Sequence, residues 1–513
     1  MTKIVRRQTG SLSRRNFIVA SAAASGGLAV GFHLPFGIAP AVAAPDTGAE
    51  INVWVAIKPD DTCVIRIARS EMGQGTLTGL AQLVAEELEC DWKKVTTEQV
   101  TPGTNLARKR AWGEMGTGGS RGIRISQDYV RRGGAAARML LLQAAADEWK
   151  VPVGEITVSE GVITHAASGR STTYGKVAAA AAKLAAPDSK SIKFKDPKDW
   201  KIAGKPLKRL DTADKLDGSK VYAIDVKLPG MLCAAIKDCP VFGGKLKSYD
   251  EARIAGMPGV RRVVKVKETA VAVVADTWWR AKTALDALPI IWDEGAGASQ
   301  SNAAIAEHLK DGLTAATTNG DRQNGNAPQA IDAAAKKVEA VYGTPFLSHA
   351  CMEVMNATVM LAGDKAEAWV PTQNAEASLA ALAEASGIPL ANCEVHRHDL
   401  GGGFGRRGGT QDYVHQAVAI AKEFPNVPIK LIWSREEDQA HDFYRPISQC
   451  RLSAGLDADG NLTGLHVRVS GQSINATLSP ASIVAGKDLR QLQGYYEQGA
   501  DAELGYGIPN LLI

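Results

Sequence analysis

The chain has 513 residues, of which 45% are apolar and 22% are charged, so it is globular and long enough to form several domains. The formal net charge at pH 7 is only +4, and no long lysine and arginine block follows the N-terminus, which argues against nucleic-acid binding. The seven cysteines include no C-x-x-C pair, which excludes the usual iron–sulfur and zinc patterns in this sequence. Their odd number also argues against a fully paired disulfide framework.

Residues 1–45 predict an export signal. Ser13-Arg14-Arg15-Asn16-Phe17-Ile18 is a twin-arginine pattern, an apolar stretch follows over 18–32, and Ala41-Val42-Ala43 offers a cleavage site. A single N-terminal membrane helix is the alternative, but the apolar stretch is short, rich in glycine and only mildly apolar. We therefore expect export of a folded protein to the periplasm by the twin-arginine route, with no membrane span after signal cleavage.

Two glycine loops in the first third of the chain are each expected to open a helix. Two short strands are predicted over 51–68, followed by a loop with Gly73, Gln74 and Gly75 and by a helix with an apolar face. The second loop contains Thr117, Gly118, Gly119 and Ser120, with Ser120 as the expected N-cap of a helix that runs to about residue 150. Either loop alone is unremarkable, but together they favour a shared ligand.

A third loop, 401–409, is the densest in glycine. A strand is predicted over 393–399 and a helix over 411–424, and a glycine loop between strand and helix points backbone N–H groups at an anion. Arg406 and Arg407 follow Gly402 and Gly403; they add donors that match phosphate, or they cap the outer face of the loop. The loop predicts a cradle for a phosphate-bearing organic cofactor.

The same loop also matches the dinucleotide fingerprint of nicotinamide and flavin enzymes, through Gly403-x-Gly405-x-x-Gly408. The first strand of that fold is buried on both faces and reads as an almost continuous apolar run. The strand here contains Glu394, His396, Arg397 and His398, so it is too polar for that position.

The composition of the chain changes at two further places. A linker bounded by prolines is predicted over 197–206, and a small α+β domain over 207–295 with a helix over 278–288. Residues 296–335 are expected to form an extended connecting segment, and 336–513 a second ordered region with a hairpin turn at 457–460. Because the sequence stops in an apolar run at 509–513, we expect this last region to be incomplete.

Several of these motifs together resemble the molybdopterin-binding large (beta) subunit of the xanthine dehydrogenase/aldehyde oxidase family, in the isoquinoline 1-oxidoreductase beta-subunit type. The motifs are Met-Gly-Gln-Gly at 72–75, Thr-Gly-Gly-Ser at 117–120, Thr-Gln at 372–373, Gly-Gly-Gly-Phe-Gly at 401–405 and the segment 222–230. The resemblance implies an α+β, multi-domain molybdenum hydroxylase architecture. Residues 46–200 and 336–513 would be its molybdopterin-binding segments, and 207–295 a hammerhead-like domain.

The resemblance implies an oxidoreductase that hydroxylates an N-heteroaromatic or aldehyde carbon with oxygen derived from water. It implies molybdenum on molybdopterin cytosine dinucleotide as the cofactor, with no protein ligand to the metal. Gln373 would hydrogen-bond an oxo ligand of molybdenum, and Phe404 and Gly405 would border the metal. The implied cofactor-binding residues are Gly73, Gln74, Gly75, Thr117, Gly118, Gly119, Ser120, Gly402, Gly403 and Arg406.

The general base of the family is a glutamate near the end of a longer chain, and no residue here matches it. The substrate-orienting arginine has no match either. We therefore expect a fragment or a split subunit that needs a second chain with the missing C-terminal part, or an inactive truncated subunit. Electrons would pass to a [2Fe–2S] cluster in an iron–sulfur small subunit, with a c-type cytochrome as a plausible onward acceptor. A nicotinamide- or flavin-dependent dehydrogenase and a non-catalytic binding protein are the alternative functions.

Three further features are interpreted individually. His396 and His398 have metal-ligand spacing on a strand, although no third ligand lies near them in sequence, which favours a packing role. His349 and Glu353 lie in a motif similar to one of the family, and Glu353 either lines a substrate pocket or makes a buried hydrogen bond. The charged run 435–438 is interpreted as a solvated loop with salt bridges.

Overall fold

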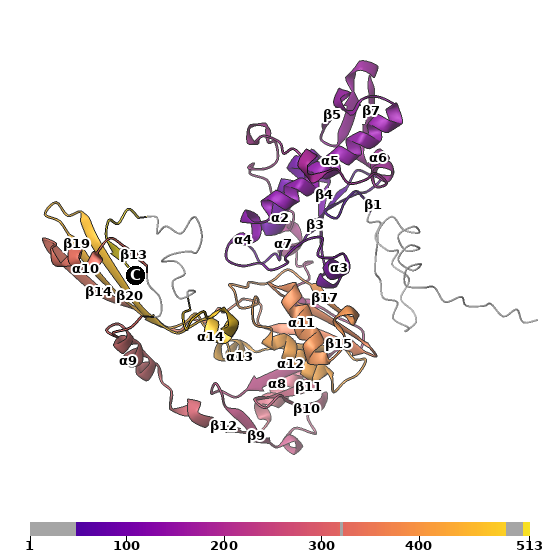
Figure 1. Ribbon diagram of the computed structural model, residues 1–513. Helices are drawn as coiled ribbons and strands as arrows, with labels where there is room; N and C mark the ends of the chain where they lie inside the picture. Colours follow the sequence, from indigo (N-terminus) through magenta and orange to yellow (C-terminus); the bar gives the residue numbers. More distant parts are fainter. Residues whose placement is uncertain (1–47, 319–321, 489–505) are drawn as a thin grey trace, which may run out of the picture. The chain divides into compact units, whose positions relative to one another are not determined.

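The structure is a computed structural model that describes residues 48–318, 322–488 and 506–513. The chain forms two compact units (Figure 1). Unit 1 contains the described residues up to Val226, Glu367–Ala380 and Pro389–Gly401; unit 2 contains Lys227–Ala366, Ala381–Ile388 and the described residues from Gly402 onward. The predicted signal lies outside the described residues. Among those that are described, no helix is long and apolar enough to cross a membrane.

Unit 1 is built on a four-stranded sheet that packs against two long helices. The strands lie in the order β1 (Ala49–Glu50), β2 (Val55–Ile57), β3 (Cys63–Ile67) and β4 (Val95–Gln99), and the helices are α2 (Thr76–Leu88) and α5 (Gln127–Trp149). Leu80, Val84 and Leu88 recur at helical spacing along α2 and are almost completely buried, so the apolar face of this helix forms much of the core. The predicted strands in 51–68 and the helix after Gly75 are confirmed.

The remaining elements of unit 1 are short. They are α3 (Pro102–Ala107), α4 (Arg121–Arg124), the sheet β5 (Ile156–Ser159), β6 (Val162–His165) and β7 (Arg170–Thr173), α6 (Tyr174–Ala181), α7 (Thr212–Leu216) and the neighbouring strands β16 (Lys365–Val370) and β17 (Cys393–Arg397). Helix α11 (Ala375–Ser386) contributes residues to both units.

The helix predicted from Ser120 to residue 150 is interrupted. Helix α4 ends at Arg124, and α5 begins only at Gln127. Ser120 has a left-handed backbone with φ of 55° and makes no side-chain hydrogen bond to the helix, so the predicted N-cap is wrong. Gly119, just before Ser120, is also left-handed, with φ of 59°. Ser120 continues this left-handed turn, whereas a serine that caps a helix needs an extended backbone.

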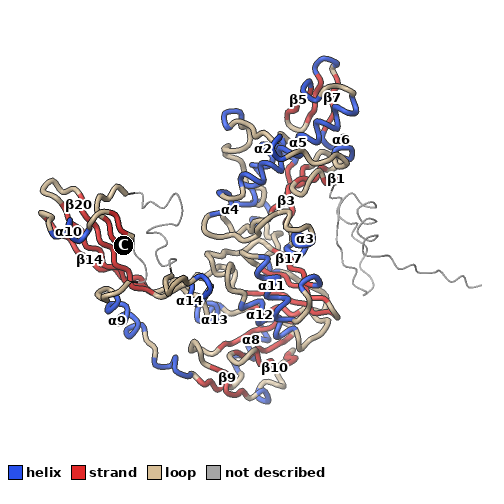
Figure 2. The backbone as a smooth tube through the Cα atoms, in the orientation of Figure 1, coloured by secondary structure: helices blue, strands red, loops and turns tan. Residues whose placement is uncertain are grey.

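Helices α2 and α5 lie side by side (Figure 2), and a glycine of α5 allows their close packing. A Cβ atom on Gly134 of α5 would clash with the carbonyl oxygen of Val84 in α2, and one on Gly133 would clash with Trp54. The backbone oxygen of Val84 cannot rotate away as a side chain can. Gly134 therefore sets the distance between the two helices, and Gly133 allows the close approach of Trp54.

Replacing Gly134 with alanine is expected to lower the free energy of unfolding by about 1–3 kcal/mol, because the helices must separate to admit the methyl group. Gly79→Ala in α2 is the matched control, since its Cβ would meet only the flexible end of Ile123, 3.1 Å away at Cδ1. Both substitutions raise helix propensity, so the difference between their free energies of unfolding in urea reports the packing of Gly134. Equal stabilities of the two variants would contradict the proposed packing.

Unit 2 contains a mixed sheet covered by helices. Strands β10 (Val260–Val266), β11 (Ala270–Ala275), β8 (Leu232–Asp238), β18 (Ile429–Ile432) and β15 (Asn356–Ala362) are hydrogen-bonded in that order, and β8 and β18 are parallel. The associated helices are α8 (Trp278–Ala287), α12 (Asp412–Ala421) and α13 (Arg435–Ala440), and a two-stranded sheet pairs β9 (Lys245–Tyr249) with β12 (Ile290–Asp293). The helices predicted over 278–288 and 411–424 are confirmed.

A second sheet in unit 2 combines strands from residues 323–344 with strands from residues 448–512. The strand order is β13 (Gln323–Asn324), β21 (Leu511–Leu512), β20 (Leu462–Gly471), β19 (Ser448–Leu456) and β14 (Lys336–Thr344). Three helices belong to this region: α9 (Asn302–Gly312), α10 (Ala327–Asp332) and α14 (Asn475–Leu478). The long hairpin of β19 and β20 turns at Asp457–Asn461, as the sequence predicts (Figure 2).

Two expectations differ from the structure. The segment 296–335 contains α9 and α10, each with a side-chain cap, from Ser301 and Asn326 respectively. The run 435–438 is helical, because Ser434 caps α13 by accepting from the N–H of Glu437. Before the boundary between the two units, residues 223–225 form a helical turn, because the Asp225 carboxylate accepts from the N–H of Tyr222, 3.1 Å away.

Candidate functional site

Three segments far apart in sequence hold one another in unit 1. The N–H of Ser70 donates to Oγ1 of Thr117 at 2.9 Å, and the hydroxyl of Ser70 donates to the carbonyl of Thr372 at 2.8 Å. Thr117 and Gln373 are joined twice: the N–H of Thr117 donates to the Gln373 carbonyl at 2.7 Å, and Nε2 of Gln373 donates to the Thr117 carbonyl at 2.9 Å. The predicted site residues Thr117 and Gln373 therefore lie together, and both are buried.

The turn after Thr117 leaves a row of backbone donors. Within the part of the chain that the structure describes, the N–H groups of Gly118, Gly119 and Ser120 have no acceptor. No atom lies within 4 Å of the position that a Cβ atom on Gly118 would take, so the space beside this turn is open. Successive free N–H groups in such a turn suit an anionic oxygen or the polar edge of a ring.

The loop at 72–75 is arranged differently, because its own chain supplies the anion. The Glu71 carboxylate is 1% exposed and accepts from the N–H groups of Gly73, Gly75 and Leu77 at 2.8, 3.1 and 2.9 Å. Arg209 adds a charge-assisted bond at 3.0 Å. The N–H groups that the sequence offers to a phosphate are thus used inside the protein.

Gln74 also turns back onto its own loop. Its Oε1 accepts from the N–H of Met72 at 2.7 Å, and its Nε2 donates to the carbonyl of Ser70 at 2.9 Å. Gln74 therefore stabilises the segment that contacts Thr117. Arg209 is held in turn by Asp211, and its hydrogen bond keeps the pKa of that carboxyl well below the usual range despite partial burial.

The glycine loop of unit 2 rests on two buried arginines. Arg406 is 2% exposed; its guanidinium pairs with Asp412 at 2.8 Å and with Asp442 at 2.9 Å, between the rings of Trp433 and Phe443. Arg407 is fully buried and donates to the carbonyls of Gly402, Glu353 and Val354. Both arginines stabilise the loop from its buried side. The guanidinium of Arg406 is itself buried, so it presents no exposed donor for the predicted contact with a phosphate.

The residues between these glycines and arginines face outward. Phe404 has a left-handed backbone with φ of 53° and is 73% exposed, and Gly405 follows with φ of 108°. Among the described residues, the N–H groups of Gly402, Gly403 and Phe404 have no acceptor. A non-glycine residue with positive φ is uncommon and costs free energy, so the braced loop holds Phe404 in a strained, exposed position.

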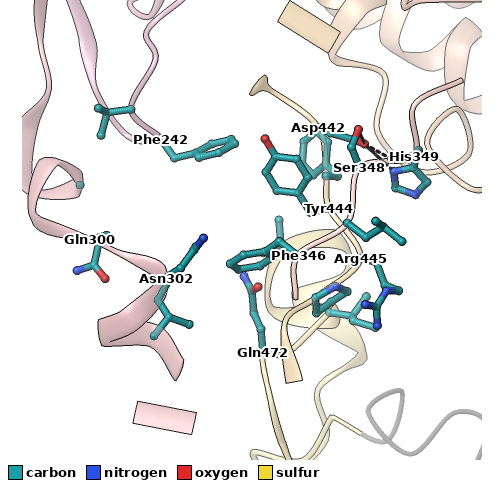
Figure 3. Close-up of a pocket in the computed structure, with 18 of the residues that line it drawn as sticks. Phe242, Gln300, Asn302, Phe346, Ser348, His349, Asp442, Tyr444, Arg445 and Gln472 are labelled. Atoms are coloured by element: carbon teal, nitrogen blue, oxygen red, sulfur yellow. Dashed lines mark hydrogen bonds and ion pairs between the residues drawn. The ribbon is translucent and has the colours of Figure 1, made fainter. Parts of the chain in front are cut away.

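A cavity of about 1190 Å³ in unit 2 borders this loop (Figure 3). Phe404, His349 and Asp442 belong to its lining. Asp442 is 4% exposed and accepts from Nδ1 of His349 at 3.0 Å and from the hydroxyl of Ser348 at 2.9 Å. Burial raises the pKa of Asp442, but the hydrogen bonds from His349 and Ser348 outweigh this and lower it overall.

The other candidates have structural roles. Glu353 is buried and accepts from Asn356 at 3.1 Å, which fits the structural interpretation. His396 stacks on Trp369 with ring centres 4.8 Å apart and contacts Glu367 at 3.1 Å. In the described ranges, no group of three or more histidine, cysteine, aspartate or glutamate residues has the geometry of a metal site. The sequence analysis does not identify Glu71 and Asp442 as site residues. Glu71 could have been found from its position before a glycine loop and a helix, but no local pattern marks Asp442.

Comparison with known proteins bears directly on these loops. Two family models, each described as a molybdopterin cofactor-binding domain, match residues 13–211 and 309–500. The beta subunit of isoquinoline 1-oxidoreductase from Brevundimonas diminuta is 30% identical over 92% of this chain and 66% of its own length. The chain belongs to the molybdopterin-binding large subunits of the xanthine dehydrogenase and aldehyde oxidase family.

Two further proteins are similar to this large subunit. A protein of Gluconacetobacter polyoxogenes named membrane-bound aldehyde dehydrogenase [pyrroloquinoline-quinone] is 28% identical over 97% of this chain and 65% of its own. The solved aldehyde oxidoreductase of Desulfovibrio gigas is 19% identical over 66% of this chain and 41% of its own, with a TM-score of 0.45. The chain thus spans about two thirds of the length of the Brevundimonas and Gluconacetobacter relatives. The expected family and its α+β, multi-domain fold class are confirmed.

The donor groups of the large subunit fit a molybdopterin cofactor at two places. Free N–H groups line the open turn at 118–120 in unit 1 and the turn at 402–404 in unit 2. A pterin and its phosphates present oxygen and nitrogen acceptors that match such donors. The 72–75 loop fits less directly, because Glu71 occupies its N–H groups.

Proposed function

We propose that this chain binds molybdopterin cytosine dinucleotide with molybdenum and forms part of an oxidoreductase that hydroxylates an N-heteroaromatic or aldehyde carbon. The overall reaction is C–H plus water to C–OH, two electrons and two protons. The observation that carries the proposal is the open turn 118–120, with its free N–H groups, beside the buried Thr117–Gln373 pair. When bound, the cofactor supplies the two-electron oxidation and the transfer of water-derived oxygen.

The chain's own residues would bind and orient the cofactor. Gly118, Gly119 and Ser120 of unit 1 would donate backbone hydrogen bonds to it. Considered by itself, the 402–404 turn of unit 2 offers donors of the same kind. Gln373 is oriented by its bond to Thr117. Arg406 and Arg407 act indirectly, since they fix the backbone of the 402–405 turn.

The same proposal includes the electron-transfer partners of the subunit and its export. The electrons pass to a [2Fe–2S] cluster in an iron–sulfur small subunit and then to a c-type cytochrome. The twin-arginine signal directs export to the periplasm, after the cofactor has been inserted in the cytoplasm.

Molybdenum content tests the proposal. The full chain, produced in a host that makes the cofactor, is expected to contain stoichiometric molybdenum by metal analysis, and Gly118→Val is expected to lose most of it. The Cβ atom of a valine at 118 meets no protein atom within 4 Å, so the side chain is expected to block the open space without disturbing the fold. Gly154→Val is the matched control, because its Cβ position is equally open and lies on another turn.

Two results would contradict the cofactor assignment. One is a purified chain with flavin absorbance or nicotinamide-dependent turnover and no molybdenum. The other is full molybdenum loading in Gly118→Val with thermal unfolding unchanged, which would move the cofactor away from this turn.

A further inference from the structure

Positive charge is concentrated in one stretch of unit 1. Residues 188–208, called the lysine strap below, contain seven lysines, three aspartates and no arginine or glutamate, so the net charge of the strap is +4. The whole chain has a formal net charge of +4, so the charges of all the other residues balance. A local excess of one sign attracts a partner of the opposite sign.

Four lysines of the strap are available to such a partner: Lys190, Lys193, Lys205 and Lys208. All four are exposed, and within the ranges that the structure describes none of their ammonium groups makes an ion pair or a hydrogen bond. A fifth, Lys198, pairs with Asp196 at 3.4 Å, but both side chains are more than half exposed, so the pair contributes little.

The backbone of the strap is held on helix α2 by carboxylates. Glu86 is 1% exposed and accepts from the N–H groups of residues 201–203 at 2.9, 2.6 and 3.0 Å. The ammonium groups of Lys195 and Lys201 both pair with Glu89 at the end of α2, at 3.0 and 2.9 Å. Two lysines therefore fix the strap to the protein, and the fixed backbone leaves the others exposed to solvent.

The two aromatic side chains of the strap pack against the protein. Phe194 and Trp200 are half-buried, and the guanidinium of Arg131 in α5 lies over both rings, 4.2 and 5.2 Å from their centres. Throughout 188–208, a stretch that the structure describes completely, no large apolar side chain is exposed. The strap can therefore attract a partner by charge, but it has no apolar side chain to insert into one.

The chemistry of the strap fits lipid headgroups better than the surface of a folded acidic protein. Arginine is enriched and lysine is depleted in protein–protein interfaces, and the planar guanidinium pairs with carboxylates in a fixed geometry. An ammonium group is a point charge on a flexible stem, and a layer of lipid phosphates demands no fixed geometry. Clusters of about four to eight basic residues bind anionic bilayers in this way.

We propose that the lysine strap attaches unit 1 to the surface of a lipid bilayer that contains anionic phospholipids. The attachment is peripheral: the four exposed lysines lie among the lipid phosphates, and no part of the strap enters the hydrocarbon. Each lysine near such a surface strengthens binding by about 5-fold. Binding is therefore reversible and falls as the salt concentration rises. It does not depend on the proposed cofactor.

Co-sedimentation of the full chain with lipid vesicles tests this attachment. Vesicles of phosphatidylcholine with about 30% phosphatidylglycerol are compared with vesicles of phosphatidylcholine alone. At about 50 mM salt, the anionic vesicles are expected to bind at least about 10-fold less of a strap variant that carries Lys190→Gln, Lys193→Gln, Lys205→Gln and Lys208→Gln. At about 500 mM salt, where charges are strongly screened, wild type and the strap variant should differ by less than about 2-fold.

A second variant with the same loss of net charge is the control. It replaces four exposed lysines of unit 2 through Lys245→Gln, Lys247→Gln, Lys267→Gln and Lys336→Gln. Its binding to the anionic vesicles should stay within about 3-fold of wild type, because these lysines lie outside the strap. Residues 1–47 are the same in every variant, so they cannot account for a difference. Thermal unfolding of both variants should match wild type, because the replaced side chains are exposed.

Four results would overturn the lipid assignment. Equal weakening by the strap and control variants would mean that only net charge matters, and a strap variant that binds like wild type would mean that the strap plays no part. Binding of wild type to polyglutamate and not to vesicles, at the same salt concentration, would identify a surface for an acidic protein. Competition by glycerol 3-phosphate at matched ionic strength would identify a site for a soluble phosphate.

Discussion

Replacing Arg406 with methionine is expected to lower the free energy of unfolding by about 3–5 kcal/mol, because it leaves two partly or fully buried carboxylates without their cation. Arg406 pairs with Asp412 and Asp442, and only 2% of the residue is exposed. Burial favours the neutral guanidinium, yet these carboxylates outweigh it and raise the pKa of Arg406. Methionine fills much of the volume but cannot donate a hydrogen bond.

Urea unfolding of the full chain measures this effect, and an exposed ion pair provides the control. Arg262 pairs with Glu423 at 2.8 Å, but about half of each side chain is exposed, so Arg262→Met is expected to cost less than about 1 kcal/mol. Adding Asp412→Asn to Arg406→Met removes one of the stranded charges and should recover part of the loss. Similar losses in the Arg406 and Arg262 variants would show that the buried pair does not stabilise the loop.

The sequence predicts the elements around the glycine loops well, because periodicity is a local property. Strand β17, helix α12 and the hairpin of β19 and β20 all follow from alternation, helical spacing or a turn sequence. The start of α5 was mistaken because serine after glycines is typical of an N-cap, whereas the turn needs left-handed backbone through Ser120. Backbone dihedrals of this kind depend on the packing of the loop and leave little trace in sequence.

Charge patterns predict less of the structure, because a run of charged residues does not show which groups it will pair with in the fold. The run 435–438 looks like a solvated loop, but Glu437 and Asp438 are 7% and 3% exposed. Their partners explain this difference. The N–H of Asp238, far away in sequence, donates to Glu437 at 2.7 Å, and Arg435 pairs with Asp438 at 2.5 Å. Arg406 and Arg407 were equally ambiguous until their acceptors were known.

The glycine loops show how one local pattern serves two purposes. At 73–77 the backbone donors surround the buried Glu71 carboxylate, and at 118–120 they are left open. Both arrangements obey the rule that a turn before a helix offers donors to an anion. The sequence predicts the donors but does not say whether the anion is a side chain or a cofactor, because that depends on the carboxylates that fold beside them.

Glu437 gives the second large prediction, which concerns pH. Burial raises the pKa of Glu437 from 4.5 to about 7, although the nearby His441 opposes this. Its Oε1 still accepts from the N–H of Asp238, and His441 lies 3.3 Å away. The native state therefore holds a proton on Glu437 between about pH 4.5 and pH 7, while the unfolded chain does not.

Across this window the native state binds more protons than the unfolded state, so the contribution of Glu437 to stability falls as pH rises. At about 1.4 kcal/mol per pKa unit, the loss amounts to roughly 3 kcal/mol by pH 8. Glu437→Gln copies the protonated carboxyl, so its stability relative to wild type should rise from near zero at pH 4.5 to about 3 kcal/mol at pH 8, as measured by urea unfolding. Glu436→Gln is the control, because burial does not affect its exposed neighbour Glu436, whose pKa is lowered by hydrogen bonds from its own backbone N–H and from Ser434. A difference between Glu437→Gln and wild type that stays constant from pH 4.5 to pH 8 would mean that Glu437 is ionised throughout in the native protein.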